Sequence, residues 1–252
     1  MDQLLPFLPL ILGCAIALGI AGIVKGVTSL GLPLVGLPLL TLFVDVRLAV
    51  ALLMIPLVLS NLLQAIQGEG TFALARRFWP DLLCLAAGTL IGTALFAALD
   101  RQILLLTIGI LSIVFSTASL LHPSLVVPPR AERWLGPPIS LISGVIGGMS
   151  TLFGPLLAIY VVGLRLPRDT FVKVISLLYL TSAGFLLIGG TAQGTAGPRE
   201  LLLSLLAMIP VYGGMVIGQR MRERIDPERF RLLVLGVVWV SGANLIRMGL
   251  GY

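Results

Sequence analysis

One unusual stretch of sequence occurs twice in this chain, at an offset of 122 residues. Residues 22–34 align without a gap on residues 144–156, and each copy is an apolar segment interrupted by glycine and proline, with two adjacent hydroxyl side chains. The identical pairs are Gly22/Gly144, Gly26/Gly148, Leu30/Leu152, Pro33/Pro155 and Leu34/Leu156. In a membrane chain, a matched pair of interrupted apolar segments is the best pointer in a sequence to a ligand site.

The composition places the chain in a membrane. Of its 252 residues, 58% are hydrophobic and 11% are charged, whereas a soluble domain carries about 25% charged residues. The long apolar runs predict an all-α, multi-pass protein of the plasma membrane whose outer surface faces lipid. The excess of basic residues lies in the loops between these runs, so it indicates membrane topology rather than nucleic-acid binding.

The apolar runs predict about eight spanning helices, with a Gly/Pro-broken or re-entrant segment at the start of each half. Residues 137–164 total 28, too many for one ordinary span and too few for two. Two half-helices, broken near Gly147-Gly148 and Gly154-Pro155, resolve this conflict. The expected segments are 4–24, 27–43, 48–66, 81–99, 103–121, 137–147, 150–164, 171–192, 201–219 and 231–250.

The duplication extends over the whole chain. At an offset of 126 residues Gly88, Gly92 and Asp100 coincide with Gly214, Gly218 and Asp226. The sequence therefore predicts a first repeat over 1–121, a connecting loop over 122–134 and a second repeat over 135–252. The two repeats form one membrane domain, because neither could bury a polar site alone.

The distribution of basic residues predicts how the repeats are related. If each repeat crosses the membrane an odd number of times, the second is inverted, and 13 Lys and Arg residues lie on the cytoplasmic side against 4 outside. If the repeats are parallel, the count is 10 against 6, leaving Lys25 aside. The positive-inside rule favours inverted repeats with both termini outside.

The duplicated motif resembles that of the sulfite exporter TauE/SafE family, whose halves each begin with a Gly-rich, Pro-containing segment. The match is closest from Gly144 to Pro155 and looser from Gly22 to Pro33, where Lys25 and Val27 interrupt the glycines. The resemblance covers nearly the whole chain. It implies a secondary transporter, an exporter or permease, for small sulfur-containing anions such as sulfite, thiosulfate or organosulfonates. No enzyme activity is expected, because the only histidine, His122, lies in a loop and no carboxylate is expected at the depth of Ser150.

We expect the substrate to bind where the two breaks approach each other near the middle of the membrane. Half-helix N-termini attract anions, glycines allow close approach of the backbone, and hydroxyls donate hydrogen bonds without carrying charge. Lys25 would supply the positive charge, and Asn61 and Gln64 share a helix face that could line the path. The expected site residues are Lys25, Gly26, Thr28, Ser29, Pro33, Asn61, Gln64, Gly147, Gly148, Ser150, Thr151 and Pro155.

Alternatives remain open for these residues and for the function. Lys25 could instead extend to the cytoplasmic interface, and Asn61 and Gln64 could serve only to bond helices together. An anion channel, or a transporter of another small organic anion, would use the same breaks. The sequence indicates no catalytic residue, metal site or cofactor. Its expected partners are a small anionic substrate and the lipid bilayer, not nucleic acid, and a homodimer and an unnamed coupling ion are compatible with it.

Overall fold

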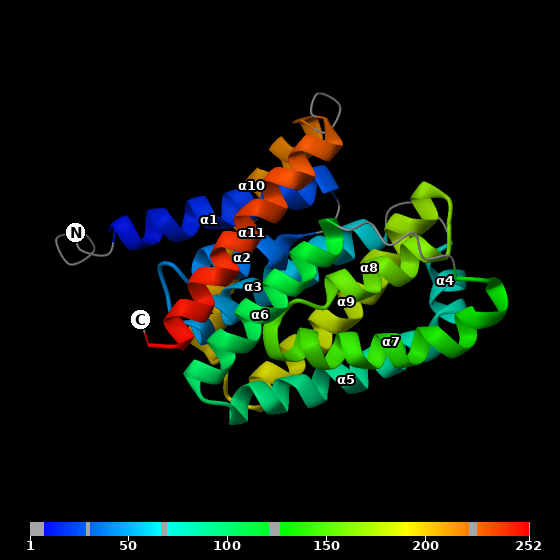
Figure 1. The fold of residues 1–252 in the computed structure, drawn as a ribbon, viewed down its shortest axis with the longest axis horizontal. Coiled ribbons are helices and arrows are strands. Elements are labelled where there is room, and N and C mark those ends of the chain that lie inside the picture. Colours follow the sequence, from blue (N-terminus) through cyan, green and yellow to red (C-terminus); the bar gives the residue numbers. More distant parts are fainter. Residues whose placement is uncertain (1–7, 29–30, 67–69, 121–126, 222–225, 252) are drawn as a thin grey trace.

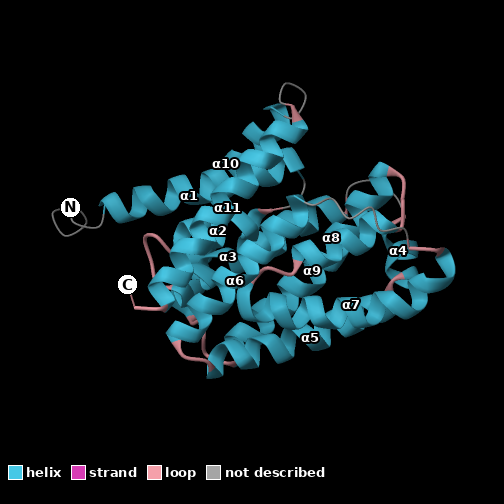
Figure 2. Ribbon diagram, viewed as in Figure 1, coloured by secondary structure: helices cyan, strands magenta, loops and turns pink. Residues whose placement is uncertain are grey.

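The chain is built from helices throughout the part that the computed structural model describes, residues 8–28, 31–66, 70–120, 127–221 and 226–251. These residues form eleven helices and no strand (Figures 1 and 2). The all-α prediction is confirmed for them. The helices are α1 (Leu8–Thr28), α2 (Leu32–Leu40), α3 (Val46–Ala65), α4 (Thr71–Arg77), α5 (Trp79–Ala98), α6 (Arg101–Leu120), α7 (Pro129–Ser150), α8 (Gly154–Gly163), α9 (Arg168–Ala192), α10 (Pro198–Met221) and α11 (Pro227–Gly249).

Seven of the described helices are long and apolar enough to cross a membrane, namely α1, α3, α5, α6, α9, α10 and α11. About eight spanning helices were expected. The remaining long helix, α7, is not apolar enough to be counted as a span. It has 22 residues but carries Glu132 in its first turn and Pro137 and Pro138 in its interior. These residues lower its hydropathy without shortening it.

Several helix boundaries differ from the expected segments. A break was expected near Gly147-Gly148, but α7 continues through these glycines to Ser150. The first segment was expected to end at residue 24, but α1 continues to Thr28, so Lys25 lies inside the helix and not at the tip of a hairpin. The loop expected over 122–134 is shorter, because α7 begins at Pro129. Proline suits a first helical position, since its missing N–H would have no helical partner there.

The helices of the two halves pack on one another in a reciprocal pattern. The first helix of the first half, α1, packs along α10 in the second half, and α7 packs along α5 in the first. The corresponding helices α3 and α9 pack together, as do α6 and α11. Neither half therefore forms a separate bundle, because each long helix packs along a long helix of the other half.

Glycines bring the α1–α10 and α5–α7 pairs into backbone contact. A methyl group on Gly88 would overlap the carbonyl oxygen of Leu141, and one on Gly214 would overlap that of Gly19. Leu141 follows Gly19 by 122 residues, so the same contact is made twice. The other three duplicated glycine pairs make contacts that match in the same way. Gly22 meets Val211 as Gly144 meets Leu85, and Gly26 meets Met215 as Gly148 meets Thr89. Likewise, Gly92 meets Val145 as Gly218 meets Ile23.

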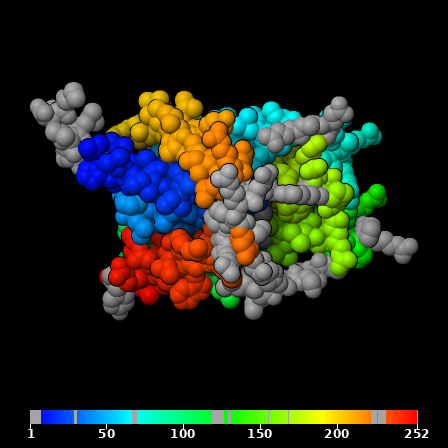
Figure 3. Space-filling view, turned by 90° about the horizontal axis from the view of Figure 1, so that it is seen from above, coloured from blue at the N-terminus to red at the C-terminus, as the bar shows by residue number. Residues whose placement is uncertain are grey.

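Large apolar side chains cover the outside of this assembly. Ile16 of α1, Ile209 of α10 and Leu233 of α11 are 62%, 71% and 70% exposed. Figure 3 shows α1, α10 and α11 on one half of a face, in blue, orange and red, with the yellow-green segments around α8 on the other half. Such a surface is stable in lipid, and α3 is the most buried of the seven apolar helices.

Candidate functional site

Each copy of the duplicated motif contains the end of one helix and the start of the next. In the first copy α1 ends at Thr28 and α2 begins at Leu32, and in the second α7 ends at Ser150 and α8 begins at Gly154. Pro33 and Pro155 occupy the second position of α2 and α8, and neither short helix has a side-chain cap at its N-terminus. An uncapped first turn presents backbone N–H groups and the positive end of the helix dipole.

The last hydroxyl before each break makes the same local bond. Thr28 Oγ1 donates to the carbonyl oxygen of Val24 at 2.8 Å, and Ser150 Oγ donates to that of Ile146 at 2.7 Å. Such bonds within a helix satisfy a hydroxyl where no water is present. Ser29, the second hydroxyl of the first copy, lies outside the described residues. The expected meeting of the two hydroxyl pairs therefore stays a prediction.

Thr151 has the least satisfied side chain in the second break. Its φ is 61°, in the left-handed region, where a β-branched residue is strained. Its backbone N–H bonds the carbonyl oxygen of Gly147 at 2.6 Å, but its hydroxyl is fully buried and has no hydrogen-bond partner among the described residues. A strained residue with a buried, unpaired hydroxyl is typical of a ligand site.

Lys25 is buried in the interior of the helix assembly. Its side chain is 1% exposed, and its Nζ donates a hydrogen bond of 2.7 Å to Asn61 Oδ1 on α3. The Asn61 amide nitrogen in turn donates to the carbonyl oxygen of Leu57 at 2.7 Å, which fixes the orientation of the amide. The ammonium group therefore points into the protein and does not extend to the surface.

Further polar pairs link the helices that surround α3. Ser176 Oγ on α9 donates to Gln64 Oε1 at 3.3 Å, so Gln64 bonds to α9 while Asn61, one turn away, bonds to α1. Thr89 Oγ1 of α5 and Ser182 Oγ of α9 lie 2.9 Å apart. These contacts put Asn61 and Gln64 at helix interfaces.

The remaining expected site residues lie in tight backbone contacts. Gly26 and Gly148 face the backbones of α10 and α5, as described above. A methyl group on Gly147 would overlap the side chain of Phe153, so this glycine lets the chain turn back on itself after α7. Pro33 is buried at the start of α2.

Several neighbours of the second duplicated segment were not among the expected site residues. The rings of Phe153 and Tyr179 meet edge to face with centroids 5.0 Å apart, and a methyl group on Gly154 would overlap the Tyr179 hydroxyl. An aromatic stripe is no signal by itself, because aromatic side chains pack throughout apolar cores. Ser176 and Thr89 each carry an isolated hydroxyl in the sequence. Their contacts with Gln64 and Ser182 can therefore be recognised only in the structure.

The polar groups around Lys25 on α1 and α3, and those after the end of α7 at Thr151, are hydroxyls, amides and one ammonium. Within the described residues, no three His, Cys, Asp or Glu side chains come together as a metal site. Hydroxyls and amides donate hydrogen bonds, and the ammonium adds a positive charge, which is the chemistry of anion binding.

The fold and this buried polar region define the class of the protein. Seven apolar helices and an apolar outer surface are those of a multi-pass membrane protein. The family model of the sulfite exporter TauE/SafE matches residues 14–245, and the chain belongs to this family of membrane transporters, which are not enzymes. The resemblance in the duplicated motif is thereby confirmed. No curated protein sequence and no solved structure matches the chain.

Proposed function

We propose that the protein is a secondary transporter of small sulfur-containing anions, such as sulfite, thiosulfate or organosulfonates. The observation that carries this proposal is the buried ammonium of Lys25, held 2.7 Å from Asn61 Oδ1. A charge at this depth is costly, about 2.5–3.5 kcal/mol on insertion scales, and generally marks a ligand or ion pathway. Its bond to Asn61 uses one of three ammonium hydrogens, and an anion would take up the others.

The two breaks would supply the other contacts with the anion. The uncapped N-termini of α2 and α8 offer N–H groups, and Thr151 offers a buried hydroxyl without a partner. Donors that carry no full charge suit a substrate that must be released again, since binding that is too tight would stop transport. The two halves contribute unequally to the proposed site, because the second copy has Gly147 at the position of Lys25 and so supplies no positive charge there.

We further propose that the halves are inverted repeats and that rocking of one against the other opens the site to each side of the membrane in turn. The reciprocal packing of α1 with α10 and of α7 with α5 supports a two-fold relation. The distribution of Lys and Arg supports inversion, with both termini outside. Reporter proteins active only outside the cytoplasm, fused to either end, should both be active.

Transport assays on the reconstituted protein test the substrate class. Proteoliposomes loaded with unlabelled sulfite should accumulate radiolabelled sulfite by exchange, with saturable kinetics, and thiosulfate or an organosulfonate should compete. Acetate serves as the carboxylate control. Transport of acetate with no transport of any sulfur oxyanion would overturn the substrate class, and unit conductances in a planar bilayer would establish a channel instead of a carrier.

Replacing Thr151 with glycine should separate stability from transport. Glycine adopts the left-handed conformation without strain, so thermal stability should rise by about 1 kcal/mol. The hydroxyl is lost, so exchange of sulfite should fall several-fold. The measurements are the melting temperature in detergent and the initial rate in proteoliposomes. A variant that is less stable, or that transports at the original rate, would contradict the role given to Thr151.

A further inference from the structure

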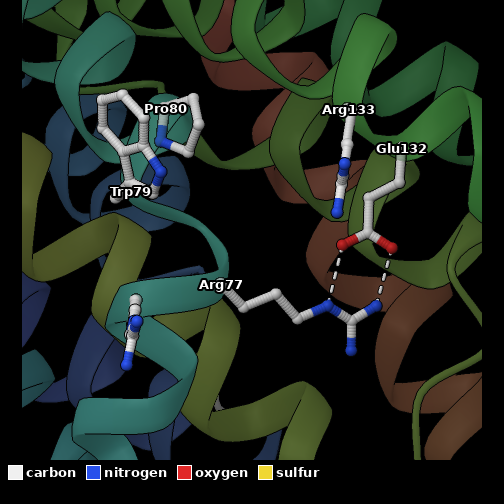
Figure 4. A pocket seen from close by; sticks show the side chains of 6 residues that line it. Arg77, Trp79, Pro80, Glu132 and Arg133 are labelled. Carbon is white, nitrogen blue, oxygen red and sulfur yellow. Dashed lines mark hydrogen bonds and ion pairs between the residues drawn. The ribbon is translucent and has the colours of Figure 1, made fainter.

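A basic cavity lies at one end of the molecule, away from the buried polar region. It occupies about 530 Å³ between α4, the start of α5 and the first turns of α7. Figure 4 shows Arg77 reaching across it to Glu132, with Trp79 and Pro80 on one side and Arg133 on the other. Its lining residues are Arg76, Arg77, Trp79, Pro80, Glu132 and Arg133.

The cavity carries two positive charges that form no ion pair with any described side chain. Arg77 binds Glu132 through both oxygens, at 2.8 and 2.6 Å, and its guanidinium lies 5.1 Å from the centroid of the Phe78 ring. Hydrogen bonding to Glu132 raises the pKa of Arg77, so this guanidinium stays charged. Arg76 and Arg133 are exposed and have no acceptor in the described part of the chain.

Large exposed aromatic side chains lie on the helices that form this cavity, and one of them, Trp79, lines it. Phe72, Trp79 and Trp134 are 84%, 58% and 82% exposed. Exposed tryptophans gather at the membrane–water interface, where the ring lies among the lipid headgroups. The short helix α4 carries Phe72, Arg76 and Arg77. No helix between α9 and α10 in the second half corresponds to α4.

We propose that this cavity binds the phosphate headgroup of an anionic phospholipid. Arg76 and Arg133 donate to the phosphate oxygens, for which the planar guanidinium is well suited. Trp79, which lines the cavity and is 58% exposed, lies against the glycerol and upper acyl chain. This exposed ring favours a lipid over a soluble anion, because a lipid bound to the two arginines also covers the ring. This proposal does not depend on what the protein transports.

Lipid titration of the purified full chain tests the site. Phosphatidylglycerol added to the delipidated protein in micelles should raise its melting temperature, whereas phosphatidylcholine should have a much smaller effect. The double variant Arg76→Gln/Arg133→Gln should bind phosphatidylglycerol about 10-fold more weakly. It leaves the Arg77–Glu132 pair intact, and both arginines are exposed, so the fold should be retained.

The matched control is Arg199→Gln/Arg247→Gln, which removes the same charge from two exposed arginines elsewhere. This control should bind the lipid as the original protein does. Equal loss in both double variants would mean a general charge effect and would overturn the proposal. Protection by glycerol phosphate equal to that by phosphatidylglycerol would assign the cavity to a soluble anion instead. Should the first double variant fail to fold, Arg133→Gln alone should weaken binding several-fold.

Discussion

Replacing Lys25 with methionine should nearly abolish sulfite transport while the protein still folds. The ammonium is the only full positive charge that we place at the substrate, and hydrogen bonds to charged groups contribute about 1.5–3 kcal/mol. Transport at low substrate concentration should therefore fall about 10- to 100-fold. The measurement is the initial rate of exchange in proteoliposomes with equal amounts of protein.

The stability of this variant should change much less than its activity. Methionine has a similar length, and removal of a buried charge is often neutral or stabilising. Asn61 Oδ1 then loses its donor, which costs about 1–3 kcal/mol, so the two effects largely cancel. Adding Asn61→Leu to Lys25→Met removes that unpaired oxygen and should restore stability without restoring transport.

The matched control is Arg199→Met, which removes one exposed positive charge and should leave transport unchanged. Normal transport by Lys25→Met would remove Lys25 from the substrate site. A variant that fails to reach the membrane, while Arg199→Met does so normally, would instead make Lys25 a structural residue.

Replacing Gly214 with alanine should disrupt the packing of α1 on α10, although only one methyl group is added. That methyl group would overlap the carbonyl oxygen of Gly19, and a backbone atom cannot move aside as a flexible side chain can. Overpacking of this kind costs about 1–3 kcal/mol, and more where a whole helix must shift. The melting temperature in detergent should fall accordingly.

The adjacent residue provides the control. Gly213 is exposed and a methyl group there would meet no atom within 4 Å. Gly213→Ala should stabilise the helix by about 0.5–1 kcal/mol, because alanine loses less backbone entropy than glycine. Gly88→Ala, at the corresponding position of α5, should destabilise the protein as Gly214→Ala does. Equal effects at Gly213 and Gly214 would contradict the close contact of the two helices.

The sequence predicted the helical fold and the location of the duplicated segments, because the length of an apolar run and the glycines and prolines that interrupt it are local signals. The duplicated glycines could also be identified from the sequence, but the residues that pack against them could not. Gly26 and Gly148 were expected at the substrate, whereas their contacts are with the backbones of α10 and α5. A glycine that admits a neighbouring helix and one that admits a ligand have the same sequence pattern.

The surroundings of the site needed the three-dimensional structure. The pairing of Lys25 with Asn61 joins residues 36 positions apart, and that of Gln64 with Ser176 joins residues 112 apart. Composition and spacing carry no information on such pairs. The left-handed conformation of Thr151 was also unpredictable, because threonine is among the residues least suited to it.

Direct binding of sulfite to the original protein and to Lys25→Met tests the central claim most directly. A ligand that binds the folded state raises the melting temperature with its concentration. Titration with sulfite should raise the melting temperature of the original protein, with saturation, and that of Lys25→Met by little or nothing at the same concentrations. Equal shifts for the two proteins would contradict the claim that the buried Lys25 ammonium binds the anion.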